Sequence, residues 1–158
     1  MDDVIYLVDN NVLTRLGREE RASVFLRSQC HVTEDVLHEA RGFADELGGV
    51  PVRPVSGAVL RSLAHVMGTV DPQDTSLVDL YANKGSADPV LVAVAIDMAD
   101  EEAQTLVPRQ VVLVTGDKAV ALTAQRLGVS TLGFEDFQRV LRVAEWGGGQ
   151  PRGCREDS

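Results

Sequence analysis

Four acidic residues are the side chains in this sequence best suited to chemistry: Asp9, Glu39, Asp88 and Asp117. Hard divalent cations prefer oxygen ligands, and magnesium usually binds a few carboxylates while keeping several water molecules. Two such ions lying close together can activate a water molecule and stabilise the leaving oxygen of a phosphoryl displacement. We therefore interpret the four carboxylates as a candidate magnesium or manganese site that acts on a phosphodiester.

Each of these carboxylates also has a simpler explanation when it is taken alone. Asp9, Asp88 and Asp117 each stand where a helix N-cap is expected, and Asp88 is the strongest case because Pro89 follows it at the first helical position. Glu39 alone is most simply a solvated residue. Because Ser, Thr or Asn would cap a helix equally well, the metal-site hypothesis depends on all four positions being carboxylates.

Other kinds of catalytic site find less support in the sequence. His31, His38 and His65 lie in separate predicted elements, and His38-Glu39 is no zinc-binding HExxH motif because residue 42 is Gly. A glycine-rich phosphate loop ending in Lys-Ser or Lys-Thr is absent from the sequence. The formal net charge of −9 counts against a nucleic-acid substrate, unless much of the negative charge surrounds bound cations.

Continuous apolar runs of strand length predict strands that are buried on both faces. The predicted strands are Val4–Val8, Cys30–Val32, Gln110–Thr115 and Val129–Leu132. Helical patterns separate them, at Asn10–Gly17, Arg18–Ser28, Thr33–Leu47, Ser56–Met67, Thr75–Ala82, Asp88–Ala103, Asp117–Leu127 and Phe134–Ala144. Strands that alternate with helices pair in parallel through right-handed crossovers, so we predict an α/β fold, a three-layer α/β/α sandwich with a central parallel sheet. Gly48–Pro54 is predicted to be a loop and Asn83–Ser86 a polar turn.

The predicted sheet explains how residues distant in the sequence could form one site. Asp9 follows the first strand directly, and Asp117 follows the strand that ends at Thr115 after a single glycine. Asp88 begins the helix that leads into that strand, and Glu39 lies on the rim of the apolar stripe of the helix Thr33–Leu47. Ligands of open α/β sheets bind beyond the carboxyl ends of the strands, so one edge can collect all four side chains.

Length and composition predict one soluble domain, residues 1–146, followed by a disordered tail, residues 147–158. Two cysteines, Cys30 and Cys154, make no disulfide framework, and the sequence shows neither a secretory signal nor an apolar run of membrane-spanning length. These features favour a reducing cytoplasm.

The segments that carry these residues resemble the PIN-domain ribonucleases. The matching segments are YLVDNNVLTRL, VTEDVLHEAR, SADPVLVAVAI and LVTGDKAVA, and the resemblance covers roughly residues 4–137. It implies that Asp9, Asp88 and Asp117 bind Mg²⁺ or Mn²⁺, that Glu39 binds metal directly or through water, and that Asn11 and Thr115 orient the ligands. The implied activity is endoribonuclease cleavage that leaves a 5′-phosphate and a 3′-hydroxyl.

Within that family the short single-domain form resembles the VapC-like toxins of toxin–antitoxin pairs. This resemblance implies an RNA substrate, a homodimer and a cognate antitoxin protein that covers the acidic cleft.

Two other interpretations stay open. One is a binding module with the same fold that does not cleave, and the other is a phosphoacceptor receiver domain. A receiver domain needs an aspartate after its third strand, and the loop residues 48–56 contain none. Lys84 and Lys118 flank the expected cleft, where they could contact phosphate or be solvated loop charges.

Overall fold

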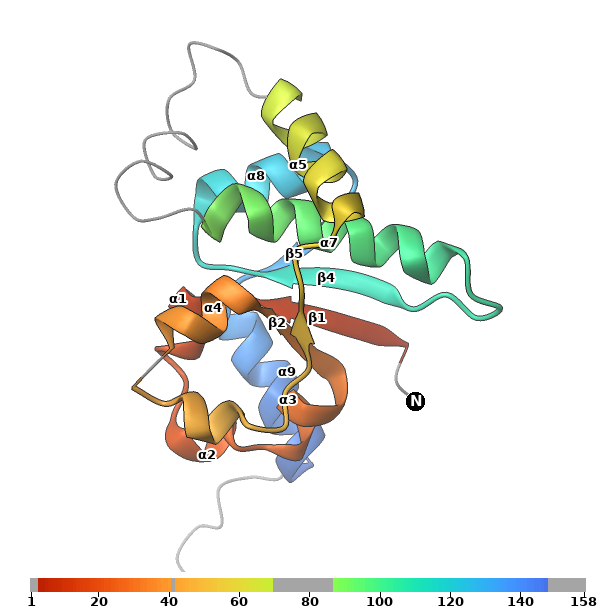
Figure 1. The fold of residues 1–158 in the computed structure, drawn as a ribbon. Helices are drawn as coiled ribbons and strands as arrows, with labels where there is room; N and C mark the ends of the chain where they lie inside the picture. The colour runs from red at the N-terminus through yellow and green to blue at the C-terminus, as the bar shows by residue number, and fades with distance from the viewer. Residues whose placement is uncertain (1–2, 41, 70–86, 148–158) are drawn as a thin grey trace, which may run out of the picture.

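One parallel sheet forms the centre of the molecule in the computed structural model, which describes residues 3–40, 42–69 and 87–147. In these ranges five strands pair in the order β3-β2-β1-β4-β5 (Figure 1). All four pairings are parallel. The strands are β1 (Val4–Val8), β2 (Cys30–Thr33), β3 (Val52–Arg53), β4 (Gln110–Val114) and β5 (Ser130–Leu132).

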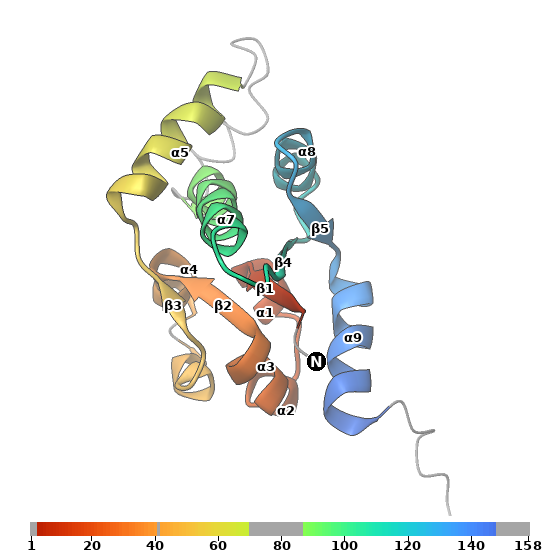
Figure 2. The same ribbon diagram turned by 90° about the vertical axis from the view of Figure 1, so that its right-hand side faces the viewer.

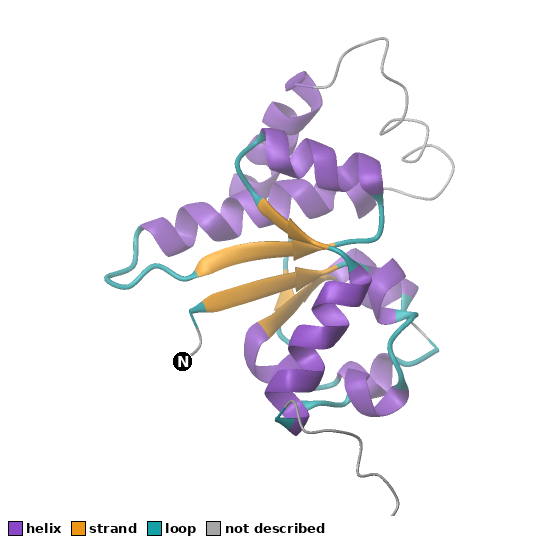
Figure 3. Ribbon diagram, turned by 180° about the vertical axis from the view of Figure 1, so that it is seen from behind, coloured by secondary structure: helices purple, strands orange, loops and turns teal. Residues whose placement is uncertain are grey.

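Helices cover both faces of this sheet, which confirms the predicted three-layer α/β/α sandwich (Figure 1, Figure 2 and Figure 3). One layer contains α5 (Gly57–Thr69), α7 (Ala87–Ala103) and α8 (Lys118–Arg126). The opposite layer contains α1 (Asn10–Leu13), α2 (Arg18–Arg21), α3 (Val24–Gln29), α4 (Glu34–Glu39), the 3-10 helix η1 (Ala44–Leu47) and α9 (Phe134–Trp146). None of the helices in the described ranges combines the length and the apolar content that crossing a bilayer requires.

The strand β1 shows why a continuous apolar run was the correct signal for this sheet. Its alternate side chains enter two separate cores, with Ile5 and Leu7 packing in the α5–α7–α8 layer and Tyr6 and Val8 packing on the other side. In the second core the centres of the Tyr6 and Phe137 rings lie 5.6 Å apart. The two rings meet edge to face, an arrangement that aromatic pairs favour.

The helix α9 covers the second core, and its Glu145 also satisfies backbone N–H groups at the start of α3. Phe137 and Leu141 are fully buried. The Glu145 carboxylate accepts hydrogen bonds from the backbone N–H groups of Val24 (3.2 Å) and Phe25 (3.1 Å). The first N–H groups of a helix have no partner within the helix, so Glu145 satisfies two of those at the start of α3.

The buried carboxylate of Glu20 ties α2 to α9. It accepts hydrogen bonds from the Gly17 N–H (2.8 Å), the Gln138 amide (3.0 Å) and the Arg142 guanidinium (2.8 Å). Burial opposes ionisation of Glu20, but these hydrogen bonds outweigh it and lower the pKa of the carboxyl group. The carboxylate therefore stabilises the α2–α9 contact as an ion.

The strand β3 was missed in the sequence, where Gly48–Pro54 was predicted to be a loop. Two residues, Val52 and Arg53, pair in parallel with Val32 and Thr33 of β2. Pro51 precedes this strand and Pro54 follows it. Proline within a sheet is confined to edges and strand ends, so the sequence correctly indicates irregular backbone but hides a short edge strand.

The single helix predicted at Thr33–Leu47 is wrong, because α4 ends at Glu39. Its start was predicted correctly, since the Thr33 hydroxyl accepts a hydrogen bond from the Val36 N–H (3.2 Å). Gly42 follows the end of α4, and the chain then turns so that the Phe43 ring lies 4.4 Å from the Arg21 guanidinium carbon. The apolar positions of the predicted stripe stay in or against the core, so their spacing could not show the break.

Two other predicted helix boundaries are also corrected. The helix predicted at Arg18–Ser28 is divided into α2 and α3, because Ser23 caps the second helix by accepting from the Leu26 N–H (3.3 Å). The helix predicted to begin after an Asp88 cap begins at Ala87, so Asp88 lies within its first turn. The predicted helix Thr75–Ala82, the turn Asn83–Ser86, Lys84, Cys154 and the tail beyond Gly147 lie outside the described residues.

We expect Phe137→Ala to lower the free energy of unfolding by about 3–5 kcal/mol, the range measured for removing a buried aromatic ring. The ring is fully buried between Tyr6 and Phe25, so the substitution leaves a cavity in the second core. Urea denaturation measures the change. Leu122→Ala is the control, because that side chain is 52% exposed on α8 and its removal should change stability by about 0.5 kcal/mol or less.

Candidate functional site

The candidate site lies where the order of the strands reverses. From β1 the chain builds the sheet in one direction through β2 and β3, and it later returns to place β4 and β5 on the other side of β1. Such a switch point lies between β1 and β4, where a crevice forms beyond the carboxyl ends of the two strands. Asp9 directly follows β1, and residues 115–117 directly follow β4.

Asp9 is a buried carboxylate at the centre of this edge, with only 4% of its surface exposed. Its Oδ1 accepts a hydrogen bond from the Asn10 N–H (2.7 Å), and its Oδ2 accepts one from the Thr115 hydroxyl (2.9 Å). Burial raises the pKa of Asp9, the two hydrogen bonds lower it, and the negative charges of Glu39 and Asp117 raise it again. Glu39 and Asp117 therefore lie close enough to Asp9 to repel its charge, although they are distant in the sequence.

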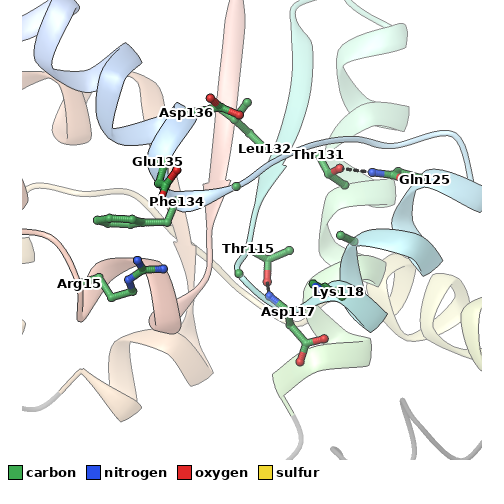
Figure 4. A pocket seen from close by; sticks show the side chains of 13 residues that line it. Arg15, Thr115, Asp117, Lys118, Gln125, Thr131, Leu132, Phe134, Glu135 and Asp136 are labelled. Atoms are coloured by element: carbon green, nitrogen blue, oxygen red, sulfur yellow. Dashed lines mark hydrogen bonds between the residues drawn. The ribbon is translucent and has the colours of Figure 1, made fainter.

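The Thr115 hydroxyl joins the two predicted aspartate ligands. It donates to Asp9 and also accepts a hydrogen bond from the Asp117 N–H (3.1 Å). A hydroxyl has one hydrogen to donate and two lone pairs that accept, so both bonds form at once. Figure 4 shows the Thr115 side chain beside the start of Asp117. Thr115 thus sets the position of Asp9 relative to Asp117.

Two asparagines hold the loops that follow β1 and β4. The Asn11 amide oxygen accepts from the Gly116 N–H (3.1 Å), which ties α1 to the loop before α8. The Asn10 amide nitrogen donates to a Glu39 carboxylate oxygen (3.2 Å), which ties α1 to the end of α4. Asn11 was identified in the sequence, whereas Asn10 was not, because its partner lies on a helix whose end was predicted incorrectly.

The helix-cap explanation for Asp9 and Asp117 also agrees with the structure. Asp9 caps α1, and Asp117 Oδ1 accepts from the N–H groups of Ala119 (2.8 Å) and Val120 (3.2 Å) at the start of α8. Each carboxylate oxygen has two lone pairs, so an oxygen that accepts one backbone hydrogen bond can still bind a cation. Capping and metal binding are therefore compatible roles for both residues.

Glu39 and Asp88 complete the predicted set. Glu39 is the last residue of α4 and is exposed, with its carboxylate directed to Asn10. Asp88 lies in the first turn of α7, and this end of α7 lies near the carboxyl edge of the sheet (Figure 1). The Asp88 side chain is outside the described residues.

The oxygen donors at this edge have the chemistry that Mg²⁺ or Mn²⁺ requires. Asp9, Glu39 and Asp117 offer carboxylates. The buried Asn10 amide oxygen has no hydrogen-bond partner among the described residues, and a buried acceptor without a donor is costly unless water or a cation satisfies it. Among the side chains that the structure describes, no three His, Cys, Asp or Glu residues converge as a ready metal-binding group, so a complete ligand set requires Asp88 or local closure of these carboxylates.

A cavity of about 580 Å³ adjoins Thr115, Gly116 and Asp117 on the β5 side of the sheet edge. The Arg15 guanidinium carbon lies 4.0 Å from the centre of the Phe134 ring on one side of it. The Gln125 amide nitrogen donates to the Thr131 hydroxyl (2.6 Å) on the other side (Figure 4). Lys118, which was identified in the sequence, also lines the cavity. Gln125, Thr131 and Phe134 come from α8, β5 and α9, and Arg15 lies in the turn after α1, so no motif in the sequence connects them.

No protein-family model and no curated protein matches this sequence. The resemblance to PIN-domain ribonucleases therefore stays a prediction from the quoted motifs.

We expect Asp9→Asn to be more stable than the wild type at pH 7 when no divalent cation is added. The pKa of Asp9 in the folded chain is raised above its ordinary value of 3.8, so the folded state binds more protons than the unfolded state and wild-type stability falls as the pH rises through this range. Asn carries no charge, so the melting temperature of Asp9→Asn should exceed that of the wild type at pH 7, and the difference should shrink as the pH falls and Asp9 of the wild type becomes protonated. Thermal melts from pH 3.5 to 7.5 test this expectation, which equal melting temperatures at pH 7 would contradict.

Proposed function

We propose that this chain is a metal-dependent endoribonuclease of the PIN-domain type that hydrolyses RNA phosphodiester bonds. One observation carries the proposal most directly. Asp9 is buried at the switch point of a parallel sheet, where the Thr115 hydroxyl links its carboxylate to the Asp117 N–H and the adjacent Asn10 donates to Glu39. Carboxylates gathered in this way destabilise a protein unless a cation binds them, so such an arrangement is typical of a functional site.

The proposed ligands of Mg²⁺ or Mn²⁺ are Asp9 and Asp117, together with Glu39 and Asp88. A bound cation of this kind polarises the phosphodiester and makes its bound water more acidic. Thr115 holds the Asp9 carboxylate in one orientation, and Asn11 holds Gly116 and so the backbone that leads to Asp117. These hydrogen bonds fix the ligands before substrate binds, which reduces the reorganisation that the reaction requires.

The net charge of −9 fits a site that contacts RNA through few residues. Affinity for nucleic acid normally comes from many lysine and arginine contacts with phosphates. Here the cations Arg15 and Lys118 line the cavity beside Asp117, so local contacts and a bound metal would supply the attraction. Weak, salt-sensitive RNA binding is expected of such a surface. By the same resemblance we propose a homodimer and a cognate antitoxin protein.

We expect Asp117→Asn to abolish metal-dependent RNA cleavage without lowering stability. Asn is as good a helix N-cap as Asp, so α8 should keep its start, whereas a neutral amide oxygen lacks the negative charge with which a carboxylate binds a hard cation. Cleavage of a fluorescent single-stranded RNA in Mn²⁺ and in EDTA measures activity, and thermal melts measure stability.

The matched control is Asp100→Asn, because Asp100 is exposed near the far end of α7. It should retain wild-type cleavage. Full activity in Asp117→Asn would leave only the capping role for this carboxylate and would favour a binding module that does not cleave RNA.

We expect Thr115→Val to lower the cleavage rate by roughly 10–100-fold, the usual effect of removing a residue that orients a metal ligand. Valine keeps the shape of the side chain but cannot donate to Asp9 or accept from the Asp117 N–H. Thr115→Ser keeps the hydroxyl and should restore most of the activity. Measuring the rate against Mn²⁺ concentration shows whether metal affinity changes, and equal rates in Val and Ser variants would remove Thr115 from the site.

A further inference from the structure

The cavity beside the acidic residues is larger than a metal ion and its bound water molecules would require. Its volume of about 580 Å³ falls within the range of roughly 300–1,000 Å³ that is typical of small-ligand sites. Asp117 and Thr115 form one part of its wall, so anything bound there lies directly beside the candidate metal ligands. Its contents would therefore be a part of the substrate next to the reacting phosphate.

The charges that line this cavity are mixed in sign. Asp117, Glu135 and Asp136 are acidic, whereas Arg15 and Lys118 are the basic lining residues. In Figure 4 Glu135 and Asp136 lie at the start of α9, and Lys118 lies beside Asp117 at the opposite end. At the α9 end the charge of Arg15 is offset by Glu135 and Asp136, whereas Lys118 favours a phosphate at the opposite end. The interior beyond Lys118 instead suits an uncharged group with hydrogen-bonding edges.

Arg15 offers this group a flat surface. Its guanidinium lies over the Phe134 ring at 4.0 Å, so one face of the guanidinium is covered while the side chain as a whole remains exposed. Bases of single-stranded RNA commonly stack on guanidinium planes and on aromatic rings. The Phe134 contact holds the guanidinium in one orientation, which lowers the entropy lost when a base stacks on it.

Gln125 offers hydrogen-bonding groups on the opposite side. One N–H of its amide donates to the Thr131 hydroxyl (2.6 Å), which fixes the plane of the amide. An amide has a second N–H and a carbonyl oxygen, and this pair can bind a base edge in a bidentate way. Stacking is tolerant of base identity, whereas such a bidentate pair discriminates between bases.

We propose that this cavity binds the nucleobase of a nucleotide next to the cleaved phosphodiester, with Arg15 as the stacking residue and Gln125 as the residue that selects the base. The inference rests on the proposed ribonuclease function and adds a sequence preference to it. Lys118 contacts the phosphate of the same nucleotide at the entrance.

The test uses the full chain and an RNA library that is randomised around one position. With Mn²⁺ the wild type should prefer one base at a fixed position relative to the cut. Gln125→Ala should reduce that preference by about tenfold while cleavage continues, because it removes the hydrogen bonds that discriminate. Arg15→Ala should weaken cleavage of all sequences by about tenfold, and Arg15→Lys should restore little, because lysine keeps the charge but not the plane.

Matched controls lie on exposed surface outside the cavity. Gln104→Ala lies beyond the end of α7, and Arg126→Ala lies on α8 without lining the cavity. Both should keep wild-type cleavage and base preference. An unchanged base preference in Gln125→Ala, or equal activity in Arg15→Ala and Arg126→Ala, would overturn the proposal.

A second measurement separates this inference from the ribonuclease proposal. Fluorescence polarisation of short labelled RNAs in Ca²⁺ measures binding without requiring cleavage. If the wild type binds RNA with a base preference that Gln125→Ala removes, the cavity assignment holds even where cleavage is absent. If the wild type cleaves RNA but neither binding nor cleavage depends on the base, the cavity assignment fails and the ribonuclease proposal stands.

Discussion

The parallel pairing of β1 with β4 is the constraint on which the site depends. The two strands pair at five positions, from Val4 with Gln110 to Val8 with Val114, so they end at the same level. The Asp9 N–H continues this ladder by donating to the Val114 carbonyl (2.9 Å). Residues that follow the strands must then meet at the switch point, although about a hundred residues separate them in the chain. Both strands are apolar on two faces, and each face packs into a separate core, which holds the pair at the centre of the sheet.

A charged group buried at such a junction needs donors, and the neighbouring side chains supply them. The Asp9 carboxylate accepts one hydrogen bond from the Asn10 N–H and one from the hydroxyl of Thr115, which directly follows the adjacent strand β4. The Thr115 hydroxyl also accepts a hydrogen bond from the Asp117 N–H, and the Asp117 carboxylate caps α8. This network holds the carboxylates near one another despite their repulsion, because moving any one of them would break hydrogen bonds that stabilise the fold. A site of this kind sacrifices some stability for a local charge that attracts cations.

The sequence predicted the features that depend on burial and missed those that depend on contacts between distant segments. Runs of apolar residues identified four strands, and an aspartate after a strand identified Asp9 and Asp117 as residues of one sheet edge. The break after Glu39 was missed, because the apolar spacing of Val36, Ala40 and Leu47 continues through it, whereas the contact of Phe43 with Arg21 joins segments distant in the sequence. Asn10, Arg15 and Gln125 were missed for the same reason. Their partners are set by the tertiary fold, and a single exposed polar residue carries no periodic signal.

The contribution of α9 has a consequence for the order in which the chain acquires its structure during translation. This helix is the last described element to leave the ribosome, and it supplies Phe137 and Leu141 to the second core, the cap of α3, and the Phe134 wall of the cavity. A nascent chain that ends before α9 therefore leaves the apolar side chains of the second core uncovered. It already contains Asp9 and Asp117, which follow β1 and β4, before the neighbouring cavity can form. Because Phe137 and Leu141 belong to the second core, we expect that core to finish folding only after α9 has been synthesised.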